Sequence, residues 1–225
     1  MKDGRFQLGI AFAVAALLVA ASAPNAADDQ AIRLTEATLN GAETKYGQAA
    51  RQRLVAWLDM IERGQQKSSD EKLELANNFF NRIPFVPDME HWGRRDYWAT
   101  PVELLASNGG DCEDYATGKY FTLLALGVEV ERLRITYVKA KTRDPAIQAH
   151  MVLTYYPVPD ATPLVLDNLD KEIKPASERG DLTPVYSFNG NGLWLAGERN
   201  SGRRLGGSSQ VDLWAELNTR INRGF

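Results

Sequence analysis

The segment GGDCEDYA, residues 109–116, contains the only cysteine of the chain, Cys112. Two acidic residues, Asp111 and Glu113, flank it, and a third, Asp114, follows. A thiol reacts as its thiolate, and negative neighbours disfavour a further negative charge close to them. Therefore either the Cys112 thiol is inert, or another group offsets the three acids.

The residues around Cys112 predict a helix that begins next to it. Asp111 is suited to cap this helix, and apolar residues recur along one side of it up to Gly127. Cys112 then lies in the first turn, where free main-chain NH groups and the positive end of the helix dipole lower the pKa of a thiol. The same NH groups can bind an oxyanion. A nucleophilic cysteine is therefore chemically reasonable at this position.

A cysteine nucleophile needs a base, and the base needs a group that orients it. Of the two histidines, His150 opens a predicted strand in QAHMVLTYY, whereas His91 lies in an aromatic-rich loop. The strand holds His150 more rigidly, so we take it as the candidate base. Asp167 ends a later predicted strand, PLVLDNL, and can accept a hydrogen bond from the imidazole. The residues alone do not separate Asp167 from its neighbour Asn168 in this role.

Each of these residues also has an ordinary structural explanation. A lone cysteine can be a small buried apolar side chain, a histidine at a strand can be a polar residue with its hydrogen bonds satisfied, and an aspartate at a strand end is common in turns. The combination is more specific than its parts. We therefore predict a catalytic triad of Cys112, His150 and Asp167.

The N-terminal residues have the pattern of a secretory signal peptide. Residues 1–7 carry two basic side chains, residues 8–21 are apolar or small, and residues 22–27 are small and turn-prone. The apolar run is shorter than the roughly 20 residues that a membrane-spanning helix needs. We expect export to the periplasm with cleavage after Ala23, Ala26 or Ala27; an uncleaved N-terminal anchor is the alternative.

The composition fits one globular domain over residues 28–225. The 225 residues are 44% hydrophobic and 24% charged. Removing residues 1–27 takes Lys2, Arg5 and Asp3 from the 26 basic and 29 acidic residues, which leaves 24 and 28, a formal charge of −4. That balance does not favour a nucleic-acid partner. A single cysteine cannot close an internal disulfide, so an exported thiol is buried and idle, paired between chains, or used as a thiol.

The hydrophobic pattern predicts helices first and strands second, which indicates an α+β domain. Residues 28–46 are weakly periodic and predict a loosely attached lead-in. Capping boxes at Ser68 and Thr100 indicate two helix starts, and the aromatic segment 85–99 predicts a long loop. The expected helices are 43–63, 68–83, 100–107, 112–126 and 210–222, and the expected strands are 133–140, 149–156, 163–169 and a hairpin within 184–197.

Three segments together resemble the bacterial transglutaminase-like cysteine proteinases, and specifically the LapG-type periplasmic proteases. They are DYWATPVELLASNGGDCEDYATGKYFTLLALGV, AHMVLTYY and PLVLDNL, and the resemblance runs from about Trp57 to Trp194. It implies a papain-like and transglutaminase-like core, in which N-terminal helices with the nucleophile at a helix start pack on a C-terminal antiparallel sheet. It also implies that Cys112 is the nucleophile, His150 the base and acid, and Asp167 the orienting group.

The resemblance implies a calcium requirement, which would answer the question raised by the acids. Asp111, Glu113 and Asp114 offer the oxygen ligands that this hard cation prefers, and a bound cation would offset their repulsion of a thiolate. The residues also allow a simpler explanation, in which Asp111 caps the helix and the other two acids complement its dipole. The spacing is not that of an EF-hand.

The resemblance further implies a substrate and a partner. The substrate is the N-terminal region of a large surface adhesin, whose release controls biofilm attachment, and the partner is an inner-membrane cyclic di-GMP receptor of the LapD type that sequesters the protease. Three alternatives remain open. The same triad could form a transglutaminase or a cell-wall amidase, or the chain could be a catalytically idle binding module.

Overall fold

The computed structural model describes residues 34–144, 146–195, 204–208 and 211–223. The predicted signal peptide, residues 1–27, lies outside the described residues. Within the described ranges, no helix has both the length and the apolar character that crossing a membrane requires.

Seven α-helices are present in the described ranges. They are α1 (Glu36–Tyr46), α2 (Gln48–Gly64), α3 (Ser69–Phe80), α4 (Asp88–His91), α5 (Pro101–Ser107), α6 (Cys112–Ala125) and α7 (Asp212–Arg223). Both predicted capping boxes form: the hydroxyl groups of Ser68 and Thr100 accept from the third helical residues of α3 and α5, whose glutamates bind back to the caps. The local capping chemistry therefore fixes where these two helices begin.

The prediction of a loosely attached lead-in over residues 28–46 is wrong for its second half, which forms α1. Thr35 caps this helix, and Leu39 and Ala42, three positions apart, are buried. The apolar stripe is narrow because only these two residues face the body, so the helical period is weak in the sequence. Likewise, the predicted long loop over residues 85–99 contains the short helix α4.

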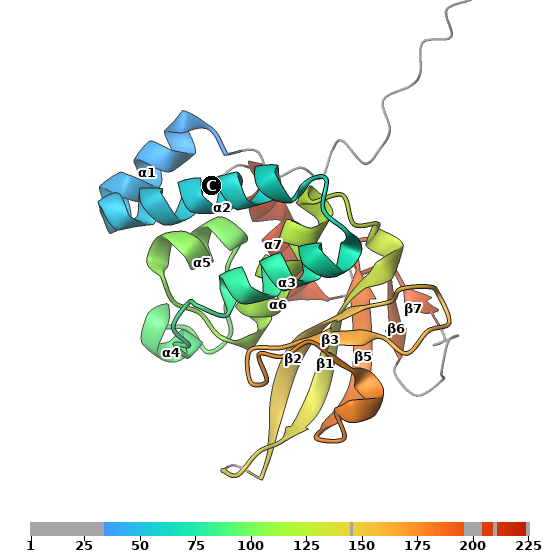
Figure 1. Cartoon of the computed structure of the whole chain (residues 1–225). Coiled ribbons are helices and arrows are strands. Elements are labelled where there is room, and N and C mark those ends of the chain that lie inside the picture. Colours follow the sequence, from blue (N-terminus) through green and yellow to red (C-terminus); the bar gives the residue numbers. More distant parts are fainter. Residues whose placement is uncertain (1–33, 145, 196–203, 209–210, 224–225) are drawn as a thin grey trace, which may run out of the picture.

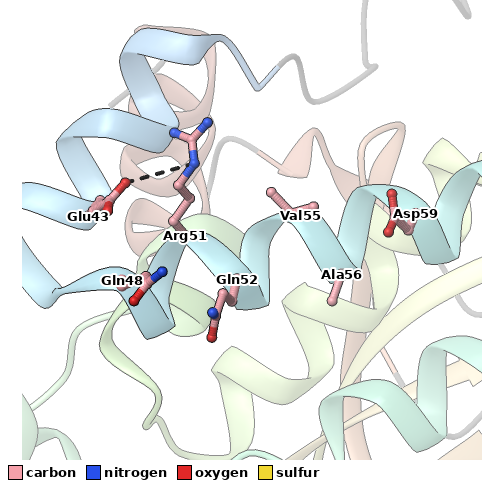
Figure 2. Close-up of a pocket in the computed structure, with 7 residues that line it drawn as sticks. All are labelled: Glu43, Gln48, Arg51, Gln52, Val55, Ala56 and Asp59. Carbon is pink, nitrogen blue, oxygen red and sulfur yellow. Dashed lines mark ion pairs between the residues drawn. The ribbon is translucent and has the colours of Figure 1, made fainter.

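A surface hollow of about 460 Å³ lies along α1 and α2 (Figure 2). Arg51 of α2 reaches across to α1, where it forms ion pairs with Glu36 at 2.8 Å and with Glu43 at 3.8 Å. The hollow is lined by Glu43, Gln48, Arg51, Gln52, Val55, Ala56 and Asp59. None of these is a predicted site residue, so the hollow reflects how the two helices pack.

Within the part of the chain that the structure describes, the strands form one seven-stranded sheet in the order β4-β3-β2-β1-β5-β6-β7, with antiparallel neighbours throughout. The strands are β1 (Leu133–Lys141), β2 (Ile147–Tyr155), β3 (Leu164–Leu166), β4 (Lys174–Pro175), β5 (Leu182–Asn189), β6 (Gly192–Leu195) and β7 (Arg204–Gly206). Within the described ranges, the 3-10 helix η2 (Val130–Arg132) lies between α6 and β1, and the 3-10 helix η3 (Ala176–Glu178) lies between β4 and β5. The predicted α+β class is confirmed.

The helices gather on one side of the sheet (Figure 1). The larger core joins aromatic and aliphatic side chains of α6, α7 and the central strands, among them Tyr120, Leu153 and Trp214. A second core lies within the helical layer and includes Trp57 of α2 and Leu104 of α5. Helix α6 contributes to both cores, and eleven of its fourteen residues are buried. The helix that begins at Cys112 is therefore held on all sides.

Gly118 lets α6 and α3 approach closely. A Cβ atom at this position would lie 2.5 Å from Cε1 of Phe80, whose side chain is fully buried. Because the ring cannot move outward, we expect Gly118→Ala to destabilise the protein by about 1–3 kcal/mol, although alanine is the better helix former by about 1 kcal/mol.

The matched control is Gly41→Ala in the exposed part of α1, where a Cβ would meet nothing within 4 Å. We expect this change to stabilise the protein by about 0.5–1 kcal/mol. Urea unfolding measures both effects; equal changes for the two variants would contradict the role of the Gly118 contact.

Candidate active site

The loop before α6 is built to present Cys112 at the helix start. Asn108 ends α5 with a left-handed backbone, φ 58°. Gly110 then pairs with Phe85, and the Val86 NH donates to the Gly110 carbonyl at 2.9 Å. A Cβ on Gly110 would lie 2.5 Å from Oδ2 of Asp114, so only glycine fits. The approach of these two segments fixes the first turn of α6.

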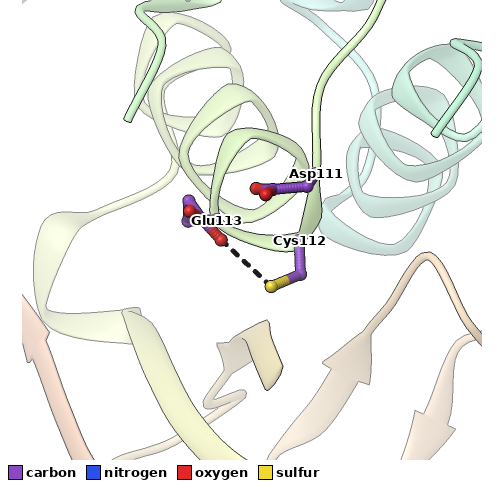
Figure 3. Close-up of side chains that lie close together, drawn as sticks. All are labelled: Asp111, Cys112 and Glu113. Atoms are coloured by element: carbon purple, nitrogen blue, oxygen red, sulfur yellow. Dashed lines mark hydrogen bonds between the residues drawn. The ribbon is translucent and has the colours of Figure 1, made fainter. Parts of the chain in front are cut away.

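The Cys112 thiol faces an acid and a strand. Its Sγ donates to Oε2 of Glu113 at 3.0 Å (Figure 3). Burial raises the pKa of the thiol well above its usual range, and the negative charges of Glu113 and Asp111 add to this, whereas the Met151 NH of β2 acts in the opposite direction. The thiol is therefore protonated in this arrangement, despite its place at a helix start.

His150 and Asp167 come together as a buried pair. Nε2 of His150 lies 2.7 Å from Oδ1 of Asp167, and both side chains are almost fully buried. The sheet register explains the contact: Leu166 pairs with Leu153, so Asp167 continues the strand opposite Val152, on the face that also carries His150. The next residue along β2 is Met151, whose main-chain NH counteracts the rise in the pKa of the Cys112 thiol, so the pair lies one residue from a group that acts on the thiol.

Asp167 is ionised and held at both carboxylate oxygens. Burial alone would raise its pKa, but hydrogen bonds and charge from His150, the Leu169 NH and Arg179 hold the pKa below its usual value. Arg179 Nη2 lies 2.7 Å from Oδ2, and the Asn168 NH donates to Oδ1 at 2.6 Å. The imidazole partner is thus Asp167 and not the side chain of Asn168.

The other histidine has a different environment. Nε2 of His91 contacts the Ser107 hydroxyl at 2.8 Å, and that hydroxyl donates to the Glu103 carbonyl at 2.7 Å. Because the hydroxyl proton is used, the imidazole acts as the donor to Ser107. His91 therefore secures the loop that leads to Cys112.

A cluster of acids surrounds the start of α6. Asp111 lies with the Cys112 sulfur and Glu113, with carboxylate and thiol atoms all within 4.8 Å of one another. Two further groups of this size bring in residues that the sequence did not single out: Asp88 joins Asp111 and Asp114, and Asp88 and Asp96 join Glu113. The three predicted metal ligands thus belong to one larger acidic cluster, defined here as Asp88, Asp96, Asp111, Glu113 and Asp114.

The members of the acidic cluster differ in how far hydrogen bonds satisfy their carboxylate oxygens. Asp114 is fully buried; its Oδ1 accepts from the Ala99 NH at 2.6 Å and its Oδ2 from the Asp111 NH at 3.2 Å. By contrast, Oδ1 of Asp88 and Oδ1 of Asp111 are buried and have no hydrogen-bond partner in the described part of the chain. Unpaired buried oxygens of this kind are costly unless a donor or a cation satisfies them.

Burial raises the pKa values of four of the five cluster acids. It raises the pKa of Asp88 to about 6. It also raises the pKa of Glu113 to about 10, with the charge of Asp111 as the next cause. The pKa values of Asp111 and Asp114 are raised as well, mainly by burial. Without a compensating positive charge the cluster therefore retains protons. Its carboxylate groups, with their unpaired oxygens, suit a hard divalent cation such as calcium.

The sequence does not predict that Asp88 and Asp96 belong to the site, because no regular spacing links them to Cys112. Both lie in the aromatic segment 85–99, where the acids are irregularly placed. The pairing of Phe85 with Gly110 carries this segment to the start of α6. The acids of this aperiodic segment are visible in the sequence, but only the tertiary structure shows that Asp88 and Asp96 lie close to the acids beside Cys112.

Over most of its length, the chain is similar in structure and sequence to solved structures of Legionella pneumophila LapG. The EGTA-treated form is 42% identical, with a TM-score of 0.72 over 83% of this chain and 96% of that one. The calcium-bound form is 41% identical, with a TM-score of 0.69 over 82% and 99%. No curated protein matches significantly.

The family assignment rests on more than half of the sequence. The family model described as bacterial transglutaminase-like cysteine proteinase BTLCP matches residues 54–183. This range includes Cys112, His150, Asp167 and the whole acidic cluster. The chain belongs to the family of bacterial transglutaminase-like cysteine proteinases.

Proposed function

We propose that the chain is a calcium-dependent cysteine endopeptidase in which Cys112 is the nucleophile, His150 the general base and acid, and Asp167 the group that orients the imidazole. The observation that carries the proposal is the buried hydrogen bond of 2.7 Å between His150 and Asp167, next to a thiol at a helix start. Membership of a cysteine proteinase family supports it.

In the proposed mechanism, the two ring nitrogens of His150 have different tasks. Nε2 donates to Asp167, so Nδ1 is the nitrogen that takes the proton of the Cys112 thiol. The thiolate attacks the peptide carbonyl, and the Cys112 NH at the start of α6 stabilises the oxyanion. The imidazolium then protonates the leaving amine, and the neutral imidazole that results accepts a proton from the water that hydrolyses the thioester. The ionised Asp167 stabilises the imidazolium in both steps.

The acidic cluster would hold the calcium ion, with Asp88, Asp96, Asp111 and Glu113 as the ligands that have oxygens to offer. Asp114 is in the same cluster, where its contacts with two main-chain NH groups shape the site. A bound cation would supply the positive charge that offsets these acids near the thiol. The calcium-bound structure of Legionella pneumophila LapG supports this proposal.

The proposed substrate is the N-terminal region of a large cell-surface adhesin, cut in the periplasm so that the adhesin is released and biofilm attachment ends. The proposed partner is an inner-membrane cyclic di-GMP receptor of the LapD type, which would sequester the protease. The support is the similarity to LapG at 41–42% identity over more than four fifths of the chain.

The nucleophile and base are tested by substitution. We expect Cys112→Ala and His150→Gln each to lower cleavage of a purified adhesin N-terminal region by about 10³-fold or more, because each removes a bond-making or proton-transferring group. His91→Gln is the matched control; its amide can still donate to the Ser107 hydroxyl, so the loop before Cys112 keeps this contact and cleavage should be retained. Fragment masses provide the readout; they also reveal amine incorporation, the mark of transglutamination. Cleavage near the unsubstituted rate by Cys112→Ala would refute the assignment.

The metal proposal is tested at Asp88, which the sequence did not single out. An excess of chelator should abolish cleavage, and calcium should restore it. Asp88→Asn keeps the size of the side chain but removes one charge, so the calcium concentration for half-maximal activity should rise about tenfold or more. Asp59→Asn, on the exposed surface of α2, should leave that concentration unchanged. Full activity in excess chelator would exclude a calcium requirement.

The raised pKa values of the cluster predict how stability depends on pH. Asp88 and Glu113 have ordinary pKa values of 3.8 and 4.5, against about 6 and about 10 in the folded chain. The folded state therefore holds protons that the unfolded state releases, so stability falls as pH rises through these values. Calcium replaces the protons, and the calcium-induced increase in melting temperature should grow between pH 5.5 and 9. A calcium effect independent of pH would contradict this cause.

A further inference from the structure

Lys119 is a buried charged residue that the proposed mechanism does not use. It lies on α6, about two turns after Cys112, and its side chain is fully buried. Its ammonium group donates to the main-chain carbonyl of Asp167 at 3.0 Å. Helix α6 thus contacts the residue that holds the imidazole, although the two are far apart in the sequence.

Burial makes a lysine costly at this position. Within the described ranges, Lys119 forms no ion pair; the carboxylate of Asp167 is bound by His150 and Arg179, and the Lys119 ammonium lies 6.0 Å from the centre of the Tyr115 ring. Burial lowers the pKa of Lys119 to about 7, which reflects the cost of keeping a charge away from water. An apolar side chain of similar volume would avoid that cost. What the amine provides in return, and an apolar side chain would not, is the hydrogen bond to the main-chain carbonyl of Asp167.

The contacts of Asp167 show what the amine adds. Arg179 binds the carboxylate, and Asn81 of α3 donates to the main-chain carbonyl at 2.9 Å. Lys119 is the donor to Asp167 that comes from α6, whose first residue is Cys112. Its side chain therefore connects the helix of the thiol to the segment of the imidazole partner by one hydrogen bond.

We propose that Lys119 is a positioning residue, which holds Asp167 in register with the helix of Cys112 and so keeps His150 aligned with the thiol. This inference rests on the proposed catalytic triad. The hydrogen bond from Lys119 acts on the main chain of Asp167, so it fixes the position of the carboxylate without competing for the carboxylate oxygens. A displacement of about 1 Å in such an arrangement can cost about 10²-fold in rate, so one hydrogen bond is sufficient to matter.

The test uses Lys119→Met, which keeps the apolar stem and removes the amine. We expect kcat for the adhesin N-terminal region to fall about tenfold to hundredfold, with KM changed by less than about twofold. The melting temperature should stay the same or rise, because a buried charge is removed. Loss of activity together with retained or increased stability is a result that a merely structural lysine would not give.

Thr122→Val on the same helix is the matched control. Its hydroxyl accepts from the buried Trp57 Nε1 at 2.9 Å, on the contact between α6 and α2. We expect this variant to have a lower melting temperature and an unchanged kcat. Lys119→Met should thus lower kcat without lowering the melting temperature, and Thr122→Val should lower the melting temperature without lowering kcat. All measurements are made with calcium present.

A double-mutant cycle identifies the residue through which Lys119 acts. If it acts through Asp167, Lys119→Met should cause no further loss of kcat when added to Asp167→Asn. An unchanged kcat in Lys119→Met, a loss of kcat that parallels a lower melting temperature, or additive losses in the cycle would each overturn the inference. Cys112→Ala separates the two proposals: if it cleaves normally, the triad is wrong, and if it alone is inactive, only the role of Lys119 fails.

Discussion

The buried carboxylate of Asp167 is the interaction on which the site depends. It is an anion with almost no exposure to water, so it must be matched by donors from the protein. Those donors come from three parts of the fold: His150 of β2, Arg179 after η3, and the main-chain NH groups of its own turn. Satisfying one charge therefore fixes the relative positions of the strand, the 3-10 turn and the loop.

A second constraint acts at the thiol. A helix start ordinarily favours a thiolate, but here burial and two carboxylates raise the pKa of Cys112. The dipole of one helix is worth about 1 kcal/mol or less near the surface, whereas desolvation and like charges shift buried groups by several pKa units. The local acids outweigh the helix. One of these two acids, Asp111, also has a buried oxygen without a hydrogen-bond partner in the described part of the chain, so an acid that disfavours the thiolate also offers an oxygen to a cation.

The sequence predicts the parts of this structure that local chemistry determines. Capping boxes indicated the starts of α3 and α5, alternation indicated the strands, and Asp111 next to Cys112 indicated the start of α6. Helix α1 was missed because two buried residues in eleven make too weak a period. Asp88 was missed because its proximity to Asp111 and Asp114 follows from the pairing of Phe85 with Gly110. Such pairing of distant segments has no counterpart in residue spacing, and the choice between Asp167 and Asn168 depended on sheet register in the same way.

The site contains several arrangements that stability alone would not favour. Lys119 is buried without an ion pair in the described ranges, Oδ1 of Asp88 lacks a hydrogen-bond partner there, and Glu113 stays protonated near neutral pH. Each lies on or against α6, the most completely enclosed helix of the domain. Because α6 is packed between two apolar cores and touches α3 through a glycine, its burial can compensate for these costs. The close packing that makes Gly118 necessary is thus also what allows charged groups to be kept in fixed positions around one thiol.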